Sequence, residues 1–351
     1  MQHRDEDVRT TAQTALENDQ DFRAHRAAIT KRMTANRVPT IPAFALDCTT
    51  LSRKILIHAN GQFGPEPACA DQPPSLNRVT GDLAVDEAFD GLKAVYELFC
   101  QVYQRPTING DKDVVAVVHY EYEPGVPYPN AFWDSVSRRM YFGDGDVNGY
   151  LTRFTRSLDI IGHEVTHGIM LSHVALKRTN QPGALSESIP DVFGSMVKQY
   201  AHRQTVDQAD WLIGDLLFTD KVKKPAALRS LKAPGSAFRD PDTIGSDPQP
   251  KHFDDYVKPE TLDEPNEAIY INCGIPNHAF YLASMEIGGT AWNTTGQIWY
   301  NALTDTKFVR DYGFERFARL THEHARTLFG VSSREAAAVQ NGWRQVGVSI
   351  E

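Results

Sequence analysis

The sequence has few cysteines, and none of them form a CxxC pair. The four cysteines, Cys48, Cys69, Cys100 and Cys273, are scattered over 351 residues. Metal ligation by cysteine is therefore not expected. A disulfide between Cys48 and Cys69 is one alternative for these residues, and buried free thiols are the alternative that we prefer.

Long apolar runs and dense clusters of basic residues are also missing. No run approaches the roughly 18 residues of a transmembrane helix, and residues 1–45 lack the apolar core of a signal peptide. We therefore expect a cytoplasmic protein or export by a non-classical route, and the location stays open. The net charge of −9 without a Lys/Arg cluster argues against nucleic acid or an anionic membrane as a partner. The composition, 41% hydrophobic and 23% charged, is typical of a soluble globular protein, which we expect to be a monomer.

The hydrophobic pattern changes near residue 155. Before this point the predicted elements are strands at 54–58, 114–120 and 139–142 and an amphipathic helix at 85–103. After it the predicted elements are helices at 158–173, 186–200, 207–218, 274–286, 296–304, 313–328 and 333–345. We therefore expect an α+β protein with an N-terminal extension or pro-segment at 1–50, a β-rich subdomain at 51–155 and a helical subdomain at 156–351.

One short motif carries the chemistry, His163-Glu164-Val165-Thr166-His167. Two histidines four residues apart on a helix project from the same face, about one turn apart. Both imidazoles can therefore bind one zinc ion. The glutamate after the first histidine can take a proton from a water molecule held there. The motif predicts a hydrolytic metal centre.

A third ligand is available twenty residues after the motif. Glu187 can complete a set of three protein ligands, which leaves the fourth position of a catalytic zinc open. Asp191 lies on the same helical face and can accept a hydrogen bond from the non-metal nitrogen of His163. Because Pro190 is tolerated best in a first helical turn, we expect Glu187 to lie at the very start of its helix.

The HExxH motif followed by the Gly183-Ala184-Leu185-Ser186-Glu187 segment resembles the thermolysin family of zinc metallopeptidases, most of all its protealysin-like subgroup. The likeness runs from about residue 52 to the C-terminus. Other matching stretches are 130–133, 143–146, 207–214, 227–235 and 271–282. The resemblance implies a thermolysin-like fold, with one zinc ion in the cleft between a β-rich domain and a helical domain, and a peptide or peptide-like substrate.

The resemblance also implies roles for individual residues. His163, His167 and Glu187 would bind zinc, and Glu164 would be the general base. Arg229 would donate a hydrogen bond to the substrate carbonyl, although a surface ion pair is an alternative for it. The expected contacts of the substrate backbone are Asn130 and Ala131. The expected apolar pocket for the side chain after the scissile bond, for which ordinary core is the alternative, is Ile160, Ile213, Leu217 and Leu228.

Two positions depart from the family where it has donors to the oxyanion. Tyr270 stands where the family has a histidine, and a phenol is a neutral donor. Arg178 stands where the family has a tyrosine, and arginine is always charged. Arg178 could stabilise an oxyanion, recognise a carboxylate of the substrate or point into solvent, and the sequence leaves these alternatives open.

The double calcium site of thermolysin needs a row of carboxylates that this sequence lacks in part. Asp159, Asp210 and Asp215 match acidic positions, but Lys198 and Leu212 replace two others. Because a lysine supplies locally the charge that a cation would supply, we expect no double calcium site.

Three functions follow from these residues. The leading one is a zinc-dependent endopeptidase. The second is a redirected zinc amide hydrolase that acts on a small peptide-like metabolite, with Tyr270 and Arg178 as altered oxyanion donors. The third, a zinc-bound interaction module, is weaker because Glu164 is intact and binding alone needs no base.

Overall fold

The computed structural model describes residues 55–59, 69–70, 80–105, 108, 114–223 and 226–350. The chain forms two compact units. The first comprises the described parts of Met1–Ile169, Gly214–Ala226 and Arg239–Gly245, and the second comprises Met170–Ile213, Ala227–Phe238 and Ser246–Glu351. The chain first passes from one unit to the other after Ile169. The sequence predicted a domain division after residue 155, and that division stays a prediction. The expected segment at 1–50 lies outside the described residues.

The first unit is built on a five-stranded sheet. Its strands, in spatial order, are β2 (Cys69–Ala70), β1 (Ile55–His58), β3 (Val114–Val117), β7 (Arg139–Phe142) and β6 (Ala131–Asp134). The three central strands run parallel, and β2 and β6 pair antiparallel at the two edges. The β-branched residues of β3 suit this buried position. A separate hairpin follows with β4 (Glu121–Glu123) and β5 (Val126–Pro127). The three predicted strands are confirmed, and the sequence analysis missed β2, β4, β5 and β6.

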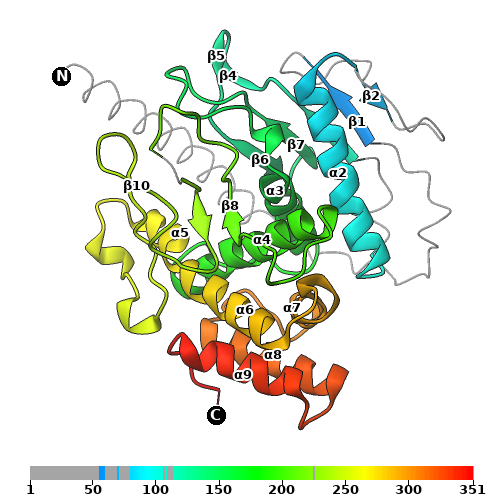
Figure 1. The fold of residues 1–351 in the computed structure, drawn as a ribbon, viewed down its shortest axis with the longest axis vertical. Helices are drawn as coiled ribbons and strands as arrows, with labels where there is room; N and C mark the ends of the chain where they lie inside the picture. The colour runs from blue at the N-terminus through cyan, green and yellow to red at the C-terminus, as the bar shows by residue number, and fades with distance from the viewer. Residues whose placement is uncertain are drawn as a thin grey trace. The chain divides into compact units, whose positions relative to one another are not determined.

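Helix α2 (Leu83–Gln101) packs on this sheet beside β1 (Figure 1). Its buried face includes Val85, Leu92 and Phe99, which confirms the helix predicted from their spacing. A Cβ atom at Gly91 would overlap the side chain of Ile161 in α3 (Leu158–Leu171). A larger residue at this position would therefore require the end of the Ile161 side chain to move.

The cysteine expectations are partly wrong. Cys100, near the end of α2, is in a disulfide, and Cys273 is a buried free thiol. The alternative of a disulfide between Cys48 and Cys69 lies outside the described residues. Sequence spacing did not reveal the disulfide of Cys100.

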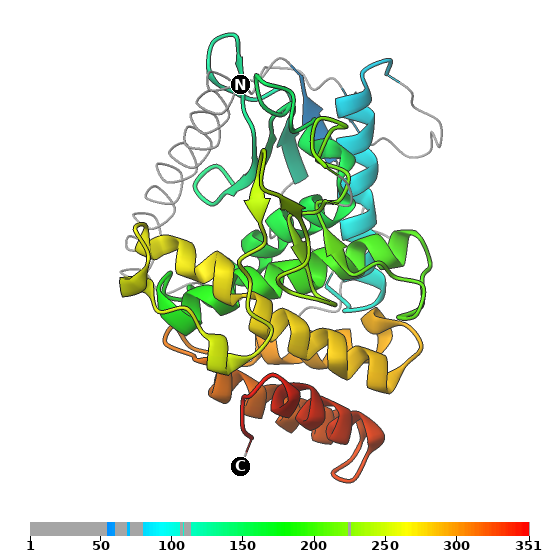
Figure 2. The ribbon, with the colours of Figure 1, turned by 60° about the vertical axis from the view of Figure 1, so that its left-hand side comes forward.

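The second unit is mostly helical. Its long helices are α4 (Asn180–Ala201), α6 (Gly274–Ile287), α7 (Thr295–Thr304), α8 (Phe314–Phe329) and α9 (Arg334–Gln345), and α5 (Ala268–Asn272) is a short one. Helix α9 packs against α6 and α8 (Figure 2). Trp343 of α9 stacks on Trp299 of α7 at 6.2 Å between ring centroids, and its indole donates a 3.0 Å hydrogen bond to Thr321. The helices predicted at 274–286, 296–304, 313–328 and 333–345 are confirmed.

The helix predicted at 207–218 is wrong. This segment contains the short strand β8 (Leu212–Ile213), which pairs antiparallel with β9 (Arg229–Ser230). Trp211 and Gly214 have φ values of 60° and 72°. Left-handed backbone at both positions cannot continue a right-handed helix, so pairing with β9 replaces the helical pattern. Two further short strands are β10 (Arg239–Asp240) and β11 (Gly245–Ser246).

Among the described residues, no helix has both the length and the apolar character that a membrane span requires.

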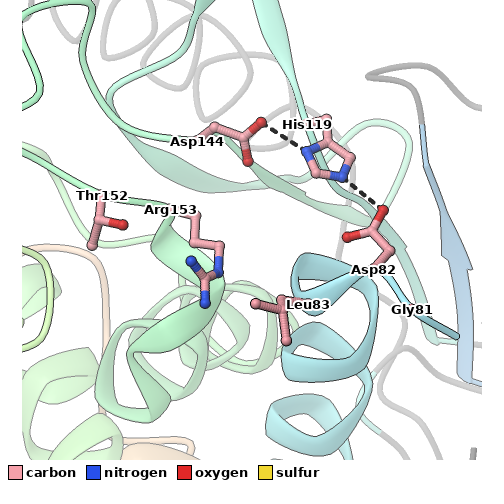
Figure 3. Close-up of a pocket in the computed structure, with 7 residues that line it drawn as sticks. All are labelled: Gly81, Asp82, Leu83, His119, Asp144, Thr152 and Arg153. Carbon is pink, nitrogen blue, oxygen red and sulfur yellow. Dashed lines mark hydrogen bonds and ion pairs between the residues drawn. The ribbon is translucent and has the colours of Figure 1, made fainter. Parts of the chain in front are cut away.

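A polar pocket of about 600 Å³ lies at the N-terminus of α2 (Figure 3). His119 lies between two carboxylates there, with Nε2 2.9 Å from Asp82, the N-cap of α2, and Nδ1 2.7 Å from Asp144. Because carboxylates only accept hydrogen bonds, both contacts are made when the ring carries two protons. Burial lowers the pKa of His119, but the hydrogen bonds and charges of Asp144 and Asp82 more than offset it, so the pKa is raised. The nearby Arg153 forms a bidentate pair with Glu87.

This bridge predicts a pH-dependent stability. Because the pKa of folded His119 is raised above 6.5, its contribution is complete below about pH 6.5 and is lost as the pH rises through the raised value. His119→Gln should therefore lower the free energy of unfolding at about pH 5.5 more than at about pH 9. Chemical unfolding at both pH values measures the difference. The exposed His202→Gln is the control, and an effect of His119→Gln that is equal at both pH values would contradict the assignment.

Candidate metal centre and active site

The two motif histidines converge on one point. His163 and His167 lie on α3, both are buried, and their Nε2 atoms are 3.1 Å apart. The ring planes meet at 81°. Because the two side chains leave the helix one turn apart and on one face, their nitrogen lone pairs can be directed at a shared ligand.

Glu187 of α4 completes a group of three ligands. One ligand atom from each of His163, His167 and Glu187 lies within 4.8 Å of the other two, and all three residues are buried. In the part of the chain that the structure describes, no other group of three or more His, Cys, Asp or Glu side chains meets this criterion. The predicted set of metal ligands is therefore assembled.

The donor set fits zinc. In a tetrahedral site with Zn–N bonds of about 2.0–2.1 Å, two ligating nitrogens are about 3.3 Å apart, which is close to the observed spacing. Two imidazoles with one carboxylate are a ligand set typical of catalytic zinc, which keeps a fourth position for water or substrate. Calcium and magnesium instead prefer oxygen ligands.

The predicted base, Glu164, is fixed by the edge strand of the sheet. Its Oε2 accepts a 3.2 Å hydrogen bond from the backbone N–H of Trp133 in β6, and its Oε1 is 4.0 Å from Nε2 of His163. A Cβ at Gly168 would lie 2.5 Å from the indole of Trp133. Gly168 therefore allows α3 to approach β6 closely enough for this hydrogen bond.

The expectation that Glu187 lies at the very start of its helix is wrong. Helix α4 begins at Asn180, about two turns before Glu187, and continues through Pro190. Every residue from Gly183 to Gln199 is buried. Packing on all sides of α4 therefore offsets the hydrogen bond that a proline removes from the interior of a helix.

Asp191, one turn after Glu187, is fully buried and is bound by an arginine. Both of its oxygens accept 2.7 Å hydrogen bonds from Arg229, and Asn277 donates a third of 2.8 Å. Burial lowers the pKa of Arg229, but the charge and hydrogen bonds of Asp191 more than offset it, so the pKa is raised. Burial and the charge of Asp191 raise the pKa of the Cys273 thiol, which therefore stays protonated. The hydrogen bond expected between Asp191 and His163 stays a prediction.

The two residues that depart from the family meet at the third ligand. Nη2 of Arg178 donates a 2.8 Å hydrogen bond to Oε1 of Glu187 and a 2.9 Å hydrogen bond to the hydroxyl of Tyr270. The Arg178 side chain is only 14% exposed. The alternative that Arg178 points into solvent is therefore excluded.

The four residues expected to form the apolar pocket differ in burial. Ile160, Ile213 and Leu217 are buried, whereas Leu228 is half-buried and donates its backbone N–H to Ile213 at 2.8 Å.

Asn130 and Ala131 lie at the start of the edge strand β6. The backbone oxygen of Asn130 accepts a 3.0 Å hydrogen bond from Gly143, and its side chain accepts a 2.8 Å hydrogen bond from the N–H of Ala131. A Cβ at Gly143 would overlap the backbone of Tyr128. The close approach of Gly143 therefore holds the backbone of residues 128–130, which lead into β6, in place.

Comparisons with known proteins agree with this geometry. Residues 44–171 match the model of the thermolysin metallopeptidase catalytic domain, and residues 175–348 match that of its alpha-helical domain. The chain is 44% identical over 271 residues to an extracellular metalloprotease of Pectobacterium carotovorum subsp. carotovorum, covering 77% of this chain and 74% of that protein. It is 41% identical to Protease PrtS of Photorhabdus sp. (strain Az29), over 86% of this chain and 78% of the relative. The structure is similar to that of the precursor of protealysin, a metalloproteinase from Serratia proteamaculans, with a TM-score of 0.76 and 39% identity over 85% of this chain and 88% of that one.

The chain belongs to the thermolysin family of metallopeptidases. As a thermolysin-like enzyme, it is a zinc metalloendopeptidase that acts on peptides, with a His-His-Glu group for the metal. Its likeness to the protealysin precursor confirms the predicted subgroup. The predicted α+β fold, with a thermolysin catalytic domain followed by an α-helical domain, is confirmed as well.

Sequence reasoning missed several residues around the centre of this thermolysin-family chain. Asn277 binds Asp191, and Gly168 and the N–H of Trp133 together position Glu164. Of these residues, only Gly168 could have been found from a sequence pattern. A glycine directly after a ligand histidine in a predicted helix indicates close packing against a neighbouring element.

The arginine pair of Asp191 predicts a large loss of stability on truncation. Asp191→Ala leaves the largely buried Arg229 without its carboxylate partner and should lower the free energy of unfolding by about 3–5 kcal/mol. Chemical unfolding followed by tryptophan fluorescence measures the change. Glu323→Ala, which removes a partner from the exposed pair with Lys307, is the control and should change little. Equal effects of the two substitutions on the free energy of unfolding would show that the pair of Asp191 with Arg229 contributes little to stability.

Proposed function

We propose that this metalloendopeptidase uses Glu164 as its general base and prefers an apolar residue after the scissile bond. The single observation that carries the proposal is the placement of Glu164. It is a buried carboxylate on the same helix as the two ligand histidines, and it accepts a hydrogen bond from the backbone N–H of Trp133 in β6. A base must be fixed within reach of the proton that it takes, and this one is fixed.

The reaction follows from the residues around the metal. When bound, zinc supplies positive charge that polarises both a water molecule and the carbonyl of the scissile bond. Glu164 takes a proton from the water as its oxygen attacks the carbonyl carbon. The same carboxyl then gives that proton to the amine that leaves. Oε2 keeps its hydrogen bond to Trp133 through these steps, so that Oε1 is the oxygen that exchanges the proton.

The substrate backbone binds along β6 in this proposal. Among the described strands, β6 is at the edge of its sheet, and an edge strand can pair with an extended peptide. Asn130 and Ala131 lie at the start of this edge and are the proposed contacts. Gly143 holds Asn130 from the β7 side, so that the edge is already formed before the substrate binds.

Arg229 and Tyr270 are proposed to steady the charge that develops on the substrate. A guanidinium has five N–H donors, and the hydrogen bonds to Asp191 use two of them. Arg229 can therefore be held by Asp191 and donate to a substrate carbonyl at the same time. The hydroxyl of Tyr270 is the proposed donor to the oxygen of the scissile carbonyl.

Lys198 is proposed to take the place of calcium in this chain. Its ammonium donates a 2.9 Å hydrogen bond to the backbone oxygen of Leu212 and lies 3.1 Å from a carboxylate oxygen of Asp210. In the first unit, Asp159 accepts hydrogen bonds from Ser157 and from the backbone of Gly214. A fixed ammonium beside Asp210 disfavours the binding of a further cation there by charge repulsion.

The role of the base predicts that Glu164→Gln binds zinc but does not turn over substrate. The amide cannot accept the proton, so kcat should fall by about 10²–10⁴-fold. Casein and a diverse peptide library measure activity, and atomic absorption measures bound zinc. Wild-type activity in Glu164→Gln would sink the proposed base. If the zinc-loaded wild type turned over only short acidic or capped compounds and left casein intact, the redirected amide hydrolase would replace the endopeptidase.

The apolar preference predicts a change of selectivity in Leu228→Ala. The proposed contacts for the residue after the scissile bond are Ile160, Ile213, Leu217 and Leu228. Shortening the half-buried Leu228 enlarges the space at small cost to the fold, so cleavage before a large apolar residue should gain about tenfold over cleavage before a small one. Peptide-library sequencing measures the ratio. Leu216→Ala, at an exposed leucine, is the control, and an unchanged ratio in Leu228→Ala would count against the assignment.

A further inference from the structure

His119 bridges two parts of the first unit that are distant in the sequence (Figure 3). Its Nε2 atom lies 2.9 Å from Oδ2 of Asp82, the N-cap of α2, and its Nδ1 atom lies 2.7 Å from Oδ2 of Asp144, in the turn after β7. These partners are 37 and 25 residues away along the chain. The three side chains are between 34% and 39% exposed, so the bridge exchanges protons with water.

The backbone on both sides of His119 belongs to the sheet. The N–H of Val118 donates to the backbone oxygen of His58 at 2.9 Å, at the end of β1, and the N–H of Tyr120 donates to that of Phe142 at 2.9 Å, at the end of β7. Between these two contacts, His119 has a left-handed φ of 57°. A residue other than glycine rarely adopts this conformation, and its surroundings must hold it there. The two carboxylates provide such contacts.

The turn that carries Asp144 leads directly to the edge strand β6. Gly143, the residue before Asp144, donates its N–H to the backbone oxygen of Asn130 at 3.0 Å. Phe142 of β7 is the partner of Ala131 in the register of β7 with β6. Asn130 and Ala131 are the proposed contacts of the substrate backbone. A shift of the turn therefore shifts the residues with which the substrate pairs.

The bridge depends on the protonation state of His119. A doubly protonated ring donates to both carboxylates, whereas a neutral ring has one N–H and donates to only one of them. The lone pair of the other nitrogen then faces a carboxylate oxygen, which it repels, whichever tautomer forms. Loss of one proton therefore opens the bridge at one end.

The charges around this ring favour its protonated form. Burial lowers the pKa of His119, but the hydrogen bonds and charges of Asp144 and Asp82 more than offset it. Arg153 lines the same pocket, and its guanidinium forms a bidentate pair with Glu87 of α2. The positive charge of Arg153 is thus offset by its own partner, and the carboxylates of Asp82 and Asp144 act on His119.

We propose that His119 is a positioning residue for the substrate, because its bridge between α2 and the turn after β7 holds the start of β6 in the form that pairs with a peptide. Loss of its proton releases that edge. This inference rests on the proposed function, in which the substrate backbone binds along β6, and it deepens that function by making binding depend on pH. Pairing along β6 is the same in the ground state and in the transition state, so release of the edge raises KM and leaves kcat nearly unchanged.

The test uses the zinc-loaded full chain and a peptide substrate with blocked ends and no titratable side chain. Steady-state kinetics at about pH 6 and about pH 9 separate KM from kcat on both sides of the titration. His119→Gln is neutral at both pH values, whereas His119→Lys keeps its charge up to about pH 10. Asp144→Asn offers an amide N–H to the neutral ring, so that the bridge survives deprotonation. His202→Gln is the matched control, because it removes an exposed histidine outside the bridge.

The proposal predicts that only the protonated bridge lowers KM. The ratio of KM in His119→Gln to KM in the wild type should be about tenfold at about pH 6, where the wild type has a charge-assisted hydrogen bond that the variant lacks. This ratio should fall to about one at about pH 9, where the wild type has lost its proton. His119→Lys and Asp144→Asn should have a lower KM than the wild type at the higher pH, and His202→Gln should follow the wild type. kcat should differ by less than about threefold among these proteins at each pH.

Three results would overturn the proposal. They are a KM ratio for His119→Gln that is equal at both pH values, a loss that appears in kcat with KM unchanged, and a KM of Asp144→Asn that rises with pH as in the wild type.

Asn130→Ala separates these results from failure of the proposed function. It removes a proposed contact of the substrate and should raise KM at both pH values. If Asn130→Ala raises KM and one of the three results is found, the His119 inference alone is rejected. If Asn130→Ala leaves KM unchanged, the substrate does not bind along β6 as proposed, and both proposals fail.

Discussion

The centre depends on how two buried carboxylates on one helix are compensated. Glu187 and Asp191 lie one turn apart on α4, and each binds an arginine from outside that helix, Arg178 for the first and Arg229 for the second. Isolated charges in a buried helix would be costly, and paired charges with good geometry are tolerated. The arginines therefore allow α4 to carry acidic groups in the interior, where a metal ligand is also protected from water.

Two glycines and several buried polar contacts complete the surroundings of the centre. Gly168 and Gly183 let neighbouring elements approach the two helices, so that the N–H of Trp133 reaches Glu164 and Tyr270 reaches Arg178. Each polar group is held by a group of fixed geometry. Such preorganisation is what a catalytic centre needs, because its dipoles then do not have to reorient during the reaction.

The sequence alone predicted those parts that depend on local spacing. The histidines of α3 share a face because of helical periodicity, and the strands and most helices follow from apolar patterns. It could not show that Arg178 binds Glu187 and Tyr270, because the three meet only through the packing of α4 on α5. It likewise gave a helix at 207–218, where pairing of β8 with β9 and a left-handed Trp211 replace it. The early start of α4 was missed because the sequence shows Pro190 but not the burial that offsets it.

Anomalous X-ray scattering at the zinc edge, from crystals of the full chain grown with zinc, tests the central claim most directly. The account predicts one strong peak about 2.0–2.2 Å from Nε2 of His163, Nε2 of His167 and one oxygen of Glu187. Arg178 should remain hydrogen-bonded to the other oxygen of Glu187. A peak with a different ligand set, or a Glu187 that turns away from the metal toward Arg178, would contradict it.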